Sequence, residues 1–505
     1  MMKAGFLSTI LLFLLLSSSS FSSIASGYNM NGSCLQAYDL VLRLRFEEAD
    51  QLLEQEKNSN PRNNLRIYLE NYQDFLRLII TEEESLFEEL SANKKTRLAV
   101  LSGGDKNSPW HLYVQAQVNL QWAFARLKFG EYTTAAAELN RAYRLLIQNQ
   151  ELFPEFSPNQ ALLGLMHILI GSIPDRYSWI AQALSLHGTY SQGLTTLKKL
   201  LNDKEVGEKY PFLHAEVIFL MSFVTSNFSP FPDESAGMVR LLESSQTQEM
   251  ILQSPLLIYA SAAFYMQQGN NDKALQLLSH RPEGSRYFPF HYLEYLTGVA
   301  RLNKLDPGAR LHFLRFVVSF RGRNFIKSAY QHLAWIELIN GNPAGYQSYL
   351  KSAALRGYSD IDSDKQAQLE AKKQTLPSVI LLKARLLSDG GYYSKALDEM
   401  KTTGLTMLET PCEKTEYTYR LARIHHRSGN TEEAINFYRK TIDRGKTLPC
   451  YFAANSALQL GNLYRMKHDN KTATAYYKLC LDLEFDEYRN SIHQKARAGL
   501  SALKN

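Results

Sequence analysis

Long apolar runs are scarce in this chain. Beyond the N-terminus, the richest one extends from Ala161 to Ile173 and is interrupted by His167 and Gly171. A helix that spans a bilayer needs roughly 20 apolar residues, so this run is too short and is better interpreted as a helix buried on most sides. The sequence therefore predicts no transmembrane span after the N-terminal segment.

The familiar catalytic motifs are absent as well. The sequence contains no Walker loop, no dinucleotide-binding fingerprint, no His-Glu-x-x-His zinc motif and no Gly-x-Ser-x-Gly elbow. The adjacent His425 and His426 would point about 100° apart on a helix, so they cannot hold one metal ion unaided. We therefore expect a protein that is not an enzyme and that has no cofactor and no metal site.

An acidic stretch looks like the start of a calcium loop but lacks the rest of one. An EF-hand loop beginning at Asp360 would need glycine at its sixth position and glutamate at its twelfth, where the chain has Lys365 and Ala371. We expect instead that Asp364 caps a helix of residues 365–373.

The net charge is small for the length. It is +6 for 505 residues, which does not by itself indicate a nucleic acid or a membrane as partner. Basic residues of segment 310–327 interleave with Phe313, Phe316, Phe320 and Phe325, but these phenylalanines recur at the spacing of a buried helix face. We predict an apolar stripe with a solvated basic edge, and no nucleic acid partner.

Segment 1–25 has the features of a secretory signal peptide. Lys3 gives the positive start, Leu7 to Leu16 is almost wholly apolar, and Ala25 ends a small-residue cleavage site. An uncleaved membrane anchor is the alternative, although the apolar run is short for one. Lipidation is not expected, because Cys34 is preceded by Asn-Gly-Ser rather than by a lipobox. The mature protein is therefore predicted to be exported, either periplasmic or secreted.

The C-terminal part carries small and large residues at fixed offsets. Leu460-Gly461 is followed by Ala473, Tyr477 and Cys480. Two helices that cross closely need small residues at the crossing and large ones beside it. This pattern resembles the tetratricopeptide repeat, a helix–turn–helix unit of about 34 residues. The resemblance implies an interaction protein rather than a catalyst.

Similar units recur upstream, with glycine or histidine at the turn between the two helices. The clearest turns are at Gly391, Gly429 and His468, spaced by slightly more than one repeat of the family, and others are at Gly130 and Gly269. The resemblance predicts an all-α, right-handed superhelix of antiparallel helix pairs. We divide the chain into a signal peptide (1–25), N-terminal repeats (26–200), divergent repeats (201–376), clear repeats (377–482) and a capping helix (483–505).

A weaker resemblance lies in the middle of the chain. Gly171-Ser172-Ile173-Pro174, with Gly188 and Gly193 and the later segment 327–330, is similar to divergent tetratricopeptide proteins of the inclusion-body-clearance type. These are interaction proteins without a known active site, so this resemblance implies only a divergent helical array.

In the tetratricopeptide family the first helix of each unit lines a concave groove. Counted from the aligned turns, the groove-facing positions of the last three units are mostly arginines and amides. The lysine of the family's carboxylate clamp is replaced by Leu381, so that ligand is not assigned. Arginine still favours carboxylates, which predicts a protein or peptide partner, of acidic character. The predicted partner-binding residues are Arg385, Tyr419, Arg420, Arg423, Arg427, Asn455, Gln459, Asn462 and Arg465.

Two functions are open at this point. The first is a non-catalytic exported scaffold that binds a peptide segment or a protein partner in the groove. The alternative is a surface glycan-binding protein, because starch-utilisation lipoproteins of gut bacteria also embed such repeats. Those proteins bind sugars with clustered exposed aromatic residues, whereas this chain has four tryptophans, each in a helical context that suits packing.

Four cysteines follow the signal peptide and would meet an oxidising compartment if the protein is exported. Cys412 and Cys450 are one repeat period apart and precede successive first helices. Helix axes lie about 8–10 Å apart and a disulfide needs Cα atoms within about 7 Å, so a bond requires that the two loops lean together; free thiols are the alternative. Cys480 is expected to be a buried thiol, and Cys34 to lie in a mobile end.

Overall fold

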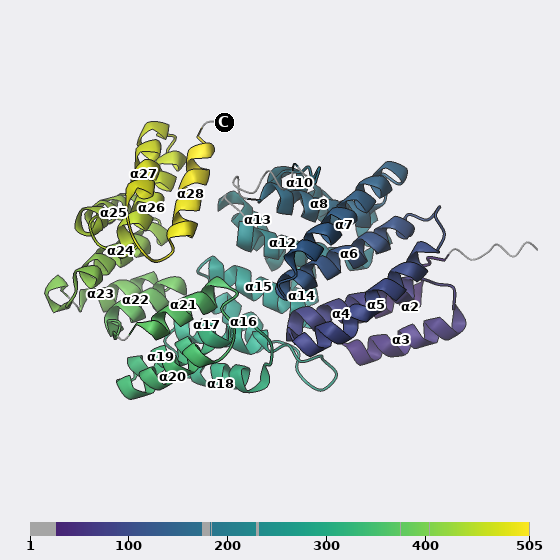
Figure 1. The fold of residues 1–505 in the computed structure, drawn as a ribbon, viewed down its shortest axis with the longest axis horizontal. Coiled ribbons are helices and arrows are strands. Elements are labelled where there is room, and N and C mark those ends of the chain that lie inside the picture. Colours follow the sequence, from purple (N-terminus) through teal and green to yellow (C-terminus); the bar gives the residue numbers. More distant parts are fainter. Residues whose placement is uncertain are drawn as a thin grey trace, which may run out of the picture.

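The computed structural model describes residues 27–173, 182, 184–228, 232–373, 375–402 and 404–503. This part of the chain contains 26 α-helices, one short 3₁₀-helix and no strand. In Figure 1, α2–α5 lie at the lower right with α6–α10 above them, α15–α20 lie at the lower centre, and α24–α28 lie at the upper left. The predicted all-α helical repeat is therefore confirmed. The predicted signal peptide, Pro174 and Trp179 lie outside the described residues.

Ten helix pairs make up most of the described chain. They are α2 (Gly32–Leu42) with α3 (Phe46–Ser59), α4 (Leu65–Thr81) with α5 (Glu84–Ser102), α6 (Trp110–Lys128) with α7 (Tyr132–Leu152), α8 (Ser157–Gly171) with α10 (Tyr190–Asn202), α15 (Pro255–Gln267) with α16 (Asn271–Ser279), α17 (Tyr292–Asn303) with α18 (Ala309–Ser319), α19 (Ile326–Ile339) with α20 (Pro343–Leu355), α22 (Val379–Asp389) with α23 (Tyr393–Lys401), α24 (Pro411–Arg427) with α25 (Thr431–Gly445), and α26 (Phe452–Met466) with α27 (Asn470–Asp482).

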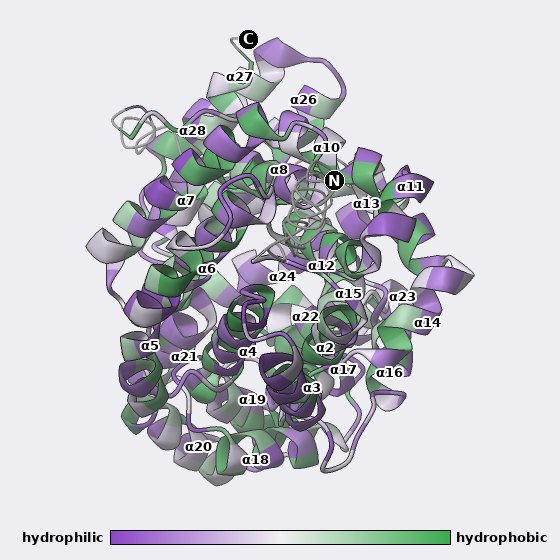
Figure 2. Ribbon diagram, turned by 90° about the vertical axis from the view of Figure 1, so that its right-hand side faces the viewer, coloured by the Kyte–Doolittle hydropathy of each residue, from purple (hydrophilic) through white to green (hydrophobic). Residues whose placement is uncertain are grey.

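The remaining helices connect or cap these pairs. Between α10 and α15 lie α11 (Lys204–Lys209), α12 (Pro211–Phe228), α13 (Pro232–Glu243) and α14 (Ser245–Gln253), and α21 (Asp362–Lys372) precedes α22. The short 3₁₀-helix η2 (Leu405–Met407) precedes α24, and α28 (Arg489–Ser501) packs on α26 and α27 at the C-terminal end. The helices carry hydrophobic and hydrophilic residues side by side, as expected for helices with one buried and one exposed face (Figure 2).

One turn geometry recurs in eight of the ten pairs. A residue with positive φ ends the first helix, and the amide of the next residue donates to the carbonyl five residues earlier, for example Asn430 to His425 at 2.9 Å. This arrangement satisfies carbonyls that the helix end leaves unpaired. The residues with positive φ are Leu44, Gly130, Gly269, Leu305, Gly341, Gly391, Gly429 and His468. The turns predicted at Gly130, Gly269, Gly391, Gly429 and His468 are therefore confirmed.

Small residues lie where the helices of a pair cross. Ala434 and Ala473 are fully buried, and so is Cys480. A Cβ added to Gly461 would lie 2.5 Å from the ring of Tyr477, so a larger side chain would force these two helices apart. The small positions recognised in the sequence are thus the close-packed ones.

The core is continuous over long stretches of the chain. The largest cluster of buried apolar residues runs from Tyr28 to Ala300 and therefore crosses the predicted boundary at residue 200. Buried polar contacts add to it: Tyr38 of α2 and Tyr72 of α4 both donate hydrogen bonds to the carboxylate of Glu216 on α12. Elements far apart in sequence are thereby held together in the N-terminal half.

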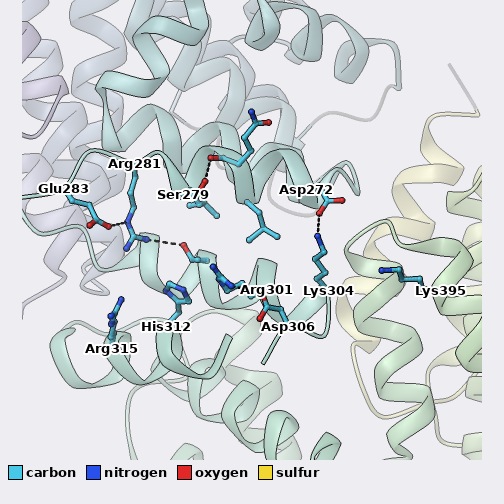
Figure 3. A pocket seen from close by; sticks show the side chains of 14 residues that line it. Asp272, Ser279, Arg281, Glu283, Arg301, Lys304, Asp306, His312, Arg315 and Lys395 are labelled. Atoms are coloured by element: carbon cyan, nitrogen blue, oxygen red, sulfur yellow. Dashed lines mark hydrogen bonds and ion pairs between the residues drawn. The ribbon is translucent and has the colours of Figure 1, made fainter. Parts of the chain in front are cut away.

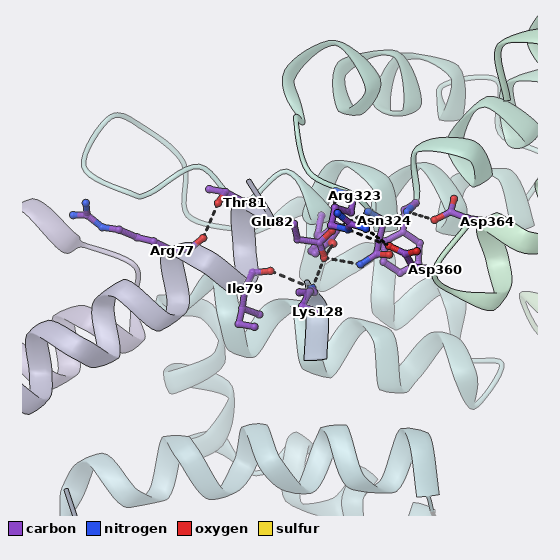
Figure 4. A network of polar contacts seen from close by, with 11 residues as sticks. Arg77, Ile79, Thr81, Glu82, Lys128, Arg323, Asn324, Asp360 and Asp364 are labelled. Carbon is purple, nitrogen blue, oxygen red and sulfur yellow. Dashed lines mark hydrogen bonds and ion pairs between the residues drawn. The ribbon is translucent and has the colours of Figure 1, made fainter. Parts of the chain in front are cut away.

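A second buried carboxylate joins the N-terminal units to the middle of the chain (Figure 4). Glu82, at the turn between α4 and α5, is ion-paired with Lys128 at the end of α6. It also accepts hydrogen bonds from the backbone amides of Arg323 (3.1 Å) and Asn324 (2.8 Å), in the loop between α18 and α19. That loop is therefore fixed by the N-terminal part of the molecule.

Two sequence predictions in this region are wrong and one is partly right. Asp364 does not cap its own helix; it accepts from the amides of Phe325 (2.6 Å) and Ser328 (2.9 Å) and so caps α19. Cys34 is fully buried in α2 rather than in a mobile end. Phe313, Phe316 and Phe320 are buried as predicted, whereas Phe325 is only partly buried and precedes α19 instead of continuing the same helix. Lys327 of the basic edge is buried too and donates to the carbonyl of Ala353.

Candidate functional site

The predicted groove residues lie on the first helices of the last three pairs. Arg420, Arg423 and Arg427 follow one another at intervals of three and four residues on α24, so they share one helix face. Arg385 comes from α22 on one side of α24, and Asn455, Gln459, Asn462 and Arg465 come from α26 on the other. Successive first helices pack together, which brings these residues to one surface.

Four of the arginines are linked through shared neighbours, and we call Arg385, Arg420, Arg423 and Arg427 the arginine cluster. Arg385 interacts electrostatically with Arg420 across the two helices. Asp389 contacts both Arg385 (3.7 Å) and Arg427 (3.3 Å). The sequence prediction that arginines of successive units converge therefore agrees with the positions of these four.

The cluster holds more positive than negative charge. Arg420 is paired with Glu416 at 2.6 Å, and Asp389 serves two arginines. Arg423 bonds to the hydroxyl of Tyr438 instead of to a carboxylate. Burial, together with the neighbouring Arg423 and Arg427, lowers the pKa of His426 to about 4, so this imidazole stays neutral at pH 7.

The arginines differ in how much of each side chain a ligand could reach. The side chain of Arg420 is only 12% exposed, whereas those of Arg385 and Arg427 are 39% and 32% exposed. Arg385 and Arg427 are therefore the members of the cluster best placed to meet a ligand.

The amides and the tyrosine mostly bond within the protein. Asn455 donates to the hydroxyl of Tyr419 (3.0 Å) and accepts from Gln459 (3.2 Å). Asn462 accepts from the hydroxyl of Tyr477 at 2.8 Å. These contacts tie α24, α26 and α27 to one another, so the amides build the wall of the groove with one or both of their polar atoms already used.

Arg465 lies apart from the cluster. It bonds to the hydroxyl of Tyr477 on α27, one unit further along. No ion pair joins Arg465 to another side chain in the part of the chain that the structure describes. It therefore extends the positive surface rather than belonging to the centre of the site.

Three aromatic residues near the arginine cluster are not among the residues predicted from the sequence. Tyr451 and Tyr488 both interact with Arg385, and their ring centroids are 4.9 Å apart. The guanidinium of Arg385 lies 5.1 Å from the ring centroid of Trp335 on α19, a cation–π arrangement. The repeat pattern gives no signal for them, because the two tyrosines precede helices and Trp335 belongs to another pair.

A disulfide lies beside the site. It joins Cys412, in the first turn of α24, to Cys450 just before α26, with Cα atoms 6.1 Å apart. Thr410 and Glu413 form a capping box at the start of α24, so this helix end is fixed twice. Tyr451 directly follows Cys450, and the bond therefore holds that ring at the edge of the arginine cluster. Among the described residues, no group of His, Cys, Asp and Glu could hold a metal ion.

The helix pairs define an all-α helical-repeat protein. Residues 418–449 match the family model of the tetratricopeptide repeat, which covers most of α24 and all of α25 and confirms the repeat recognised in the sequence. No curated protein matches this chain. The resemblance of segment 171–194 to inclusion-body-clearance proteins has no support beyond the sequence.

The matched family allows a general statement of function. Tetratricopeptide repeats bind proteins or peptides and are typical of non-catalytic scaffolds. The repeat at residues 418–449 therefore supports a general role in protein interaction. No described helix is both long and apolar enough to cross a membrane.

Proposed function

We propose that the protein is an exported scaffold whose C-terminal repeats bind an acidic peptide segment of a protein partner. The observation that carries this proposal is the excess of arginine over carboxylate on the first helices α22, α24 and α26. Arginine can form two parallel hydrogen bonds with one carboxylate. An acidic side chain that enters between Arg385 and Arg427 would compete with Asp389 for both guanidinium groups.

Aromatic neighbours favour a peptide that lies along this surface. The half-buried Tyr451 and Tyr488 give flat apolar area next to the charges, and tyrosine is common at binding hot spots. The aliphatic parts of a peptide could pack on the tyrosine rings while its carboxylates reach the arginines. Asn462, whose amide nitrogen has no described hydrogen bond, is the groove amide best placed to bind the peptide backbone.

Export is supported by two independent features of the chain. Segment 1–25 has the composition of a signal peptide. The disulfide between Cys412 and Cys450 belongs to an oxidising compartment. Sequencing of the mature N-terminus in the native source tests this part: we expect it to begin at Ser26, and a mature chain that begins at Met1 would contradict it.

The tryptophans do not favour the glycan-binding alternative. Trp110, Trp122 and Trp335 are 8%, 2% and 4% exposed, so none of them offers an open ring face for a sugar. A glycan array that shows specific binding, lost on substitution of exposed tyrosines, would nevertheless favour that alternative over a peptide partner.

Substitution of the two most exposed cluster arginines tests the groove. The double variant Arg385→Gln with Arg427→Gln should lose the partners that the wild-type protein captures from the native exported fraction. Capture by the wild-type protein should also weaken as salt rises, because charges more than about 8–10 Å apart are screened at physiological ionic strength.

A matched control removes the same charge elsewhere. Lys351 and Arg444 are exposed and have no described ion pair, so Lys351→Gln with Arg444→Gln should leave capture unchanged. If the groove variant and the control capture the same partners equally well, the binding surface is not the arginine cluster.

A further inference from the structure

A second charged surface lies on the other side of the helix pairs. A pocket of about 710 Å³ is lined by α16, the following loop, α17 and α18, with Lys395 of α23 at one end (Figure 3). The helices α16, α18 and α23 are the second helices of their pairs, whereas the arginine cluster belongs to first helices. The pocket is therefore separate from the groove of the proposed function.

Most charged groups of the pocket are already paired with one another. Arg281 bonds to Glu283 at 2.9 Å, and Arg301 to Asp306 at 2.6 Å. Lys304 bonds to Asp272 at 2.9 Å. These three pairs nearly cancel, so the charge that remains available to a ligand must come from the other lining residues.

Two exposed cations at opposite ends of the pocket have no such partner. Arg315 on α18 and Lys395 on α23 form no ion pair within the described part of the chain, and they lie on either side of the pocket in Figure 3. Between them the pocket offers the hydroxyl of Ser279 and the amide of Gln276 together with Leu275 and Leu278.

We propose that this pocket binds an extended peptide with two separated carboxylates, one held by Arg315 and the other by Lys395. The intervening backbone lies over Ser279 and Gln276, which supply hydrogen-bonding groups.

The carboxylates of the pocket lining disfavour ligands whose negative charges are closely spaced. Asp272, Glu283 and Asp306 line the pocket together with Arg315 and Lys395. A nucleic acid or a sulfated polysaccharide carries closely spaced negative groups and would meet these carboxylates as well as the cations, and like charges placed together cost several kcal/mol. A peptide whose carboxylates are well separated avoids that repulsion.

A contact between two distant turns places Lys395 at one end of the pocket. Gly391 of the α22–α23 turn packs against Gly269 of the α15–α16 turn, so closely that a Cβ on Gly391 would lie 1.8 Å from the carbonyl oxygen of Gly269. The hydroxyl of Tyr392 accepts from Asn271 (3.0 Å) and donates to Asp272 (2.8 Å). This contact brings Lys395 across from α16 and α17 and so completes the far end of the site.

Fluorescence anisotropy with synthetic peptides tests the proposal on the full chain. The probes carry two glutamates separated by Gly–Ser linkers of increasing length, and their counterparts carry glutamine at one or both positions. We expect one range of linker lengths to bind best and the single-glutamate peptides to bind roughly tenfold more weakly or worse. Equal binding of single- and double-glutamate peptides would overturn the two-ended site.

Substitutions test whether the peptide binds in this pocket. Arg315→Glu with Lys395→Glu should weaken the best peptide by roughly tenfold or more, and Ser279→Trp, which fills the pocket without a change of charge, should weaken it too. Lys351→Glu with Arg444→Glu changes the net charge by the same amount and should have little effect.

The contrary outcomes are equally specific. If the control reversal weakens binding as much as the pocket reversal, only the overall charge matters and the site is refuted. It is also refuted if Ser279→Trp leaves binding intact, or if only the groove variant lowers it. Single-stranded RNA or a sulfated polysaccharide that binds the pocket more tightly than every peptide would overturn the assignment of a peptide ligand.

Discussion

Three buried carboxylates show how the groups around one residue decide its charge. Burial raises the pKa of Glu82, but the ion pair with Lys128 and its other donors more than offset this, so the net pKa lies below the ordinary value. Burial raises the pKa of Asp364 to about 6, with two backbone amides opposing it. Glu216 accepts hydrogen bonds from the hydroxyls of Tyr38 and Tyr72, but burial outweighs them and raises its pKa.

Glu216 should make the stability of the protein depend on pH. Because its pKa in the folded state is raised, its contribution is fully present below the pKa of the unfolded chain and is lost as pH rises through the folded pKa. The variant Glu216→Gln keeps the side-chain shape without the charge. We expect its stability relative to wild type to increase with pH from the ordinary glutamate range upward, by about 1.4 kcal/mol for each unit of pKa shift.

Denaturant unfolding of both proteins over a pH series measures this effect. The exposed Glu205 is a suitable control position, since Glu205→Gln should leave the pH dependence of wild type unchanged. Identical pH profiles of wild type and Glu216→Gln would show that the buried carboxylate does not titrate as its surroundings imply.

At the scale of elements, the start of α24 is fixed more firmly than most helix ends. Pro411 occupies the first turn of the helix. The side chains of Thr410 and Glu413 accept hydrogen bonds from backbone amides that the helix start leaves unpaired. The disulfide then links this turn to the start of α26. Two successive first helices are thereby held at the end where Tyr451 borders the arginine cluster.

The disulfide should stabilise the C-terminal repeats. Replacing both partners, Cys412→Ser with Cys450→Ser, should lower the free energy of unfolding by roughly 2–4 kcal/mol, since the bond closes a loop of 38 residues. Mass spectrometry of the unreduced, digested protein should find the two peptides linked.

Cys34 and Cys480 should resist alkylation in the folded protein, because burial raises the pKa of each thiol to about 12.

A reductant provides the control for the disulfide prediction. It should destabilise the wild-type protein and leave the double serine variant unchanged. Separate, alkylated peptides of Cys412 and Cys450 from the oxidised protein would rule the bond out.

At the scale of the whole molecule, distant segments close on one another. Glu216 joins α12 to α2 and α4, and Glu82 joins the second and third pairs to the α18–α19 loop. Gly391 joins the α22–α23 turn to the α15–α16 turn. A regular array needs contacts only between neighbouring units. This chain adds long-range contacts, which fix how its successive parts are placed.

The touching turns can be tested with a matched pair of substitutions. Gly391 and Gly429 have nearly the same backbone conformation, with φ of 84° and 85°. Alanine at either position should cost about 1–2 kcal/mol for the left-handed conformation. Only Gly391→Ala should cost clearly more, because its Cβ would collide with Gly269, whereas nothing lies within 4 Å of a Cβ on Gly429.

Thermal or denaturant unfolding of the two variants gives the comparison. Gly391→Ala should also weaken peptide binding at the pocket, since it displaces Lys395, while Gly429→Ala should not. Equal destabilisation by the two substitutions would show that the turns do not touch in solution.

Prediction from the sequence succeeded where a local pattern forces a local structure. The turns at Gly391 and Gly429 and the crossing at Gly461 follow from offsets within one unit. Leu44 and Leu305 form the same turn. The sequence does not reveal these two turns, because leucine rarely adopts the left-handed conformation, which costs about 1–2 kcal/mol. Asp364 was assigned to the wrong helix, because its partners Phe325 and Ser328 become neighbours only in the folded molecule.

The sequence by itself determined the repeated helix pair, its small residues at the crossings and the line of arginines on α24. These features depend on the helical period and on side chains less than one repeat apart. Only the tertiary structure decided which arginines share Asp389, which aromatic rings border them, and that Gly269 meets Gly391. Small rotations between successive pairs add up along the chain, so contacts between distant units depend on every pair in between and on no single motif.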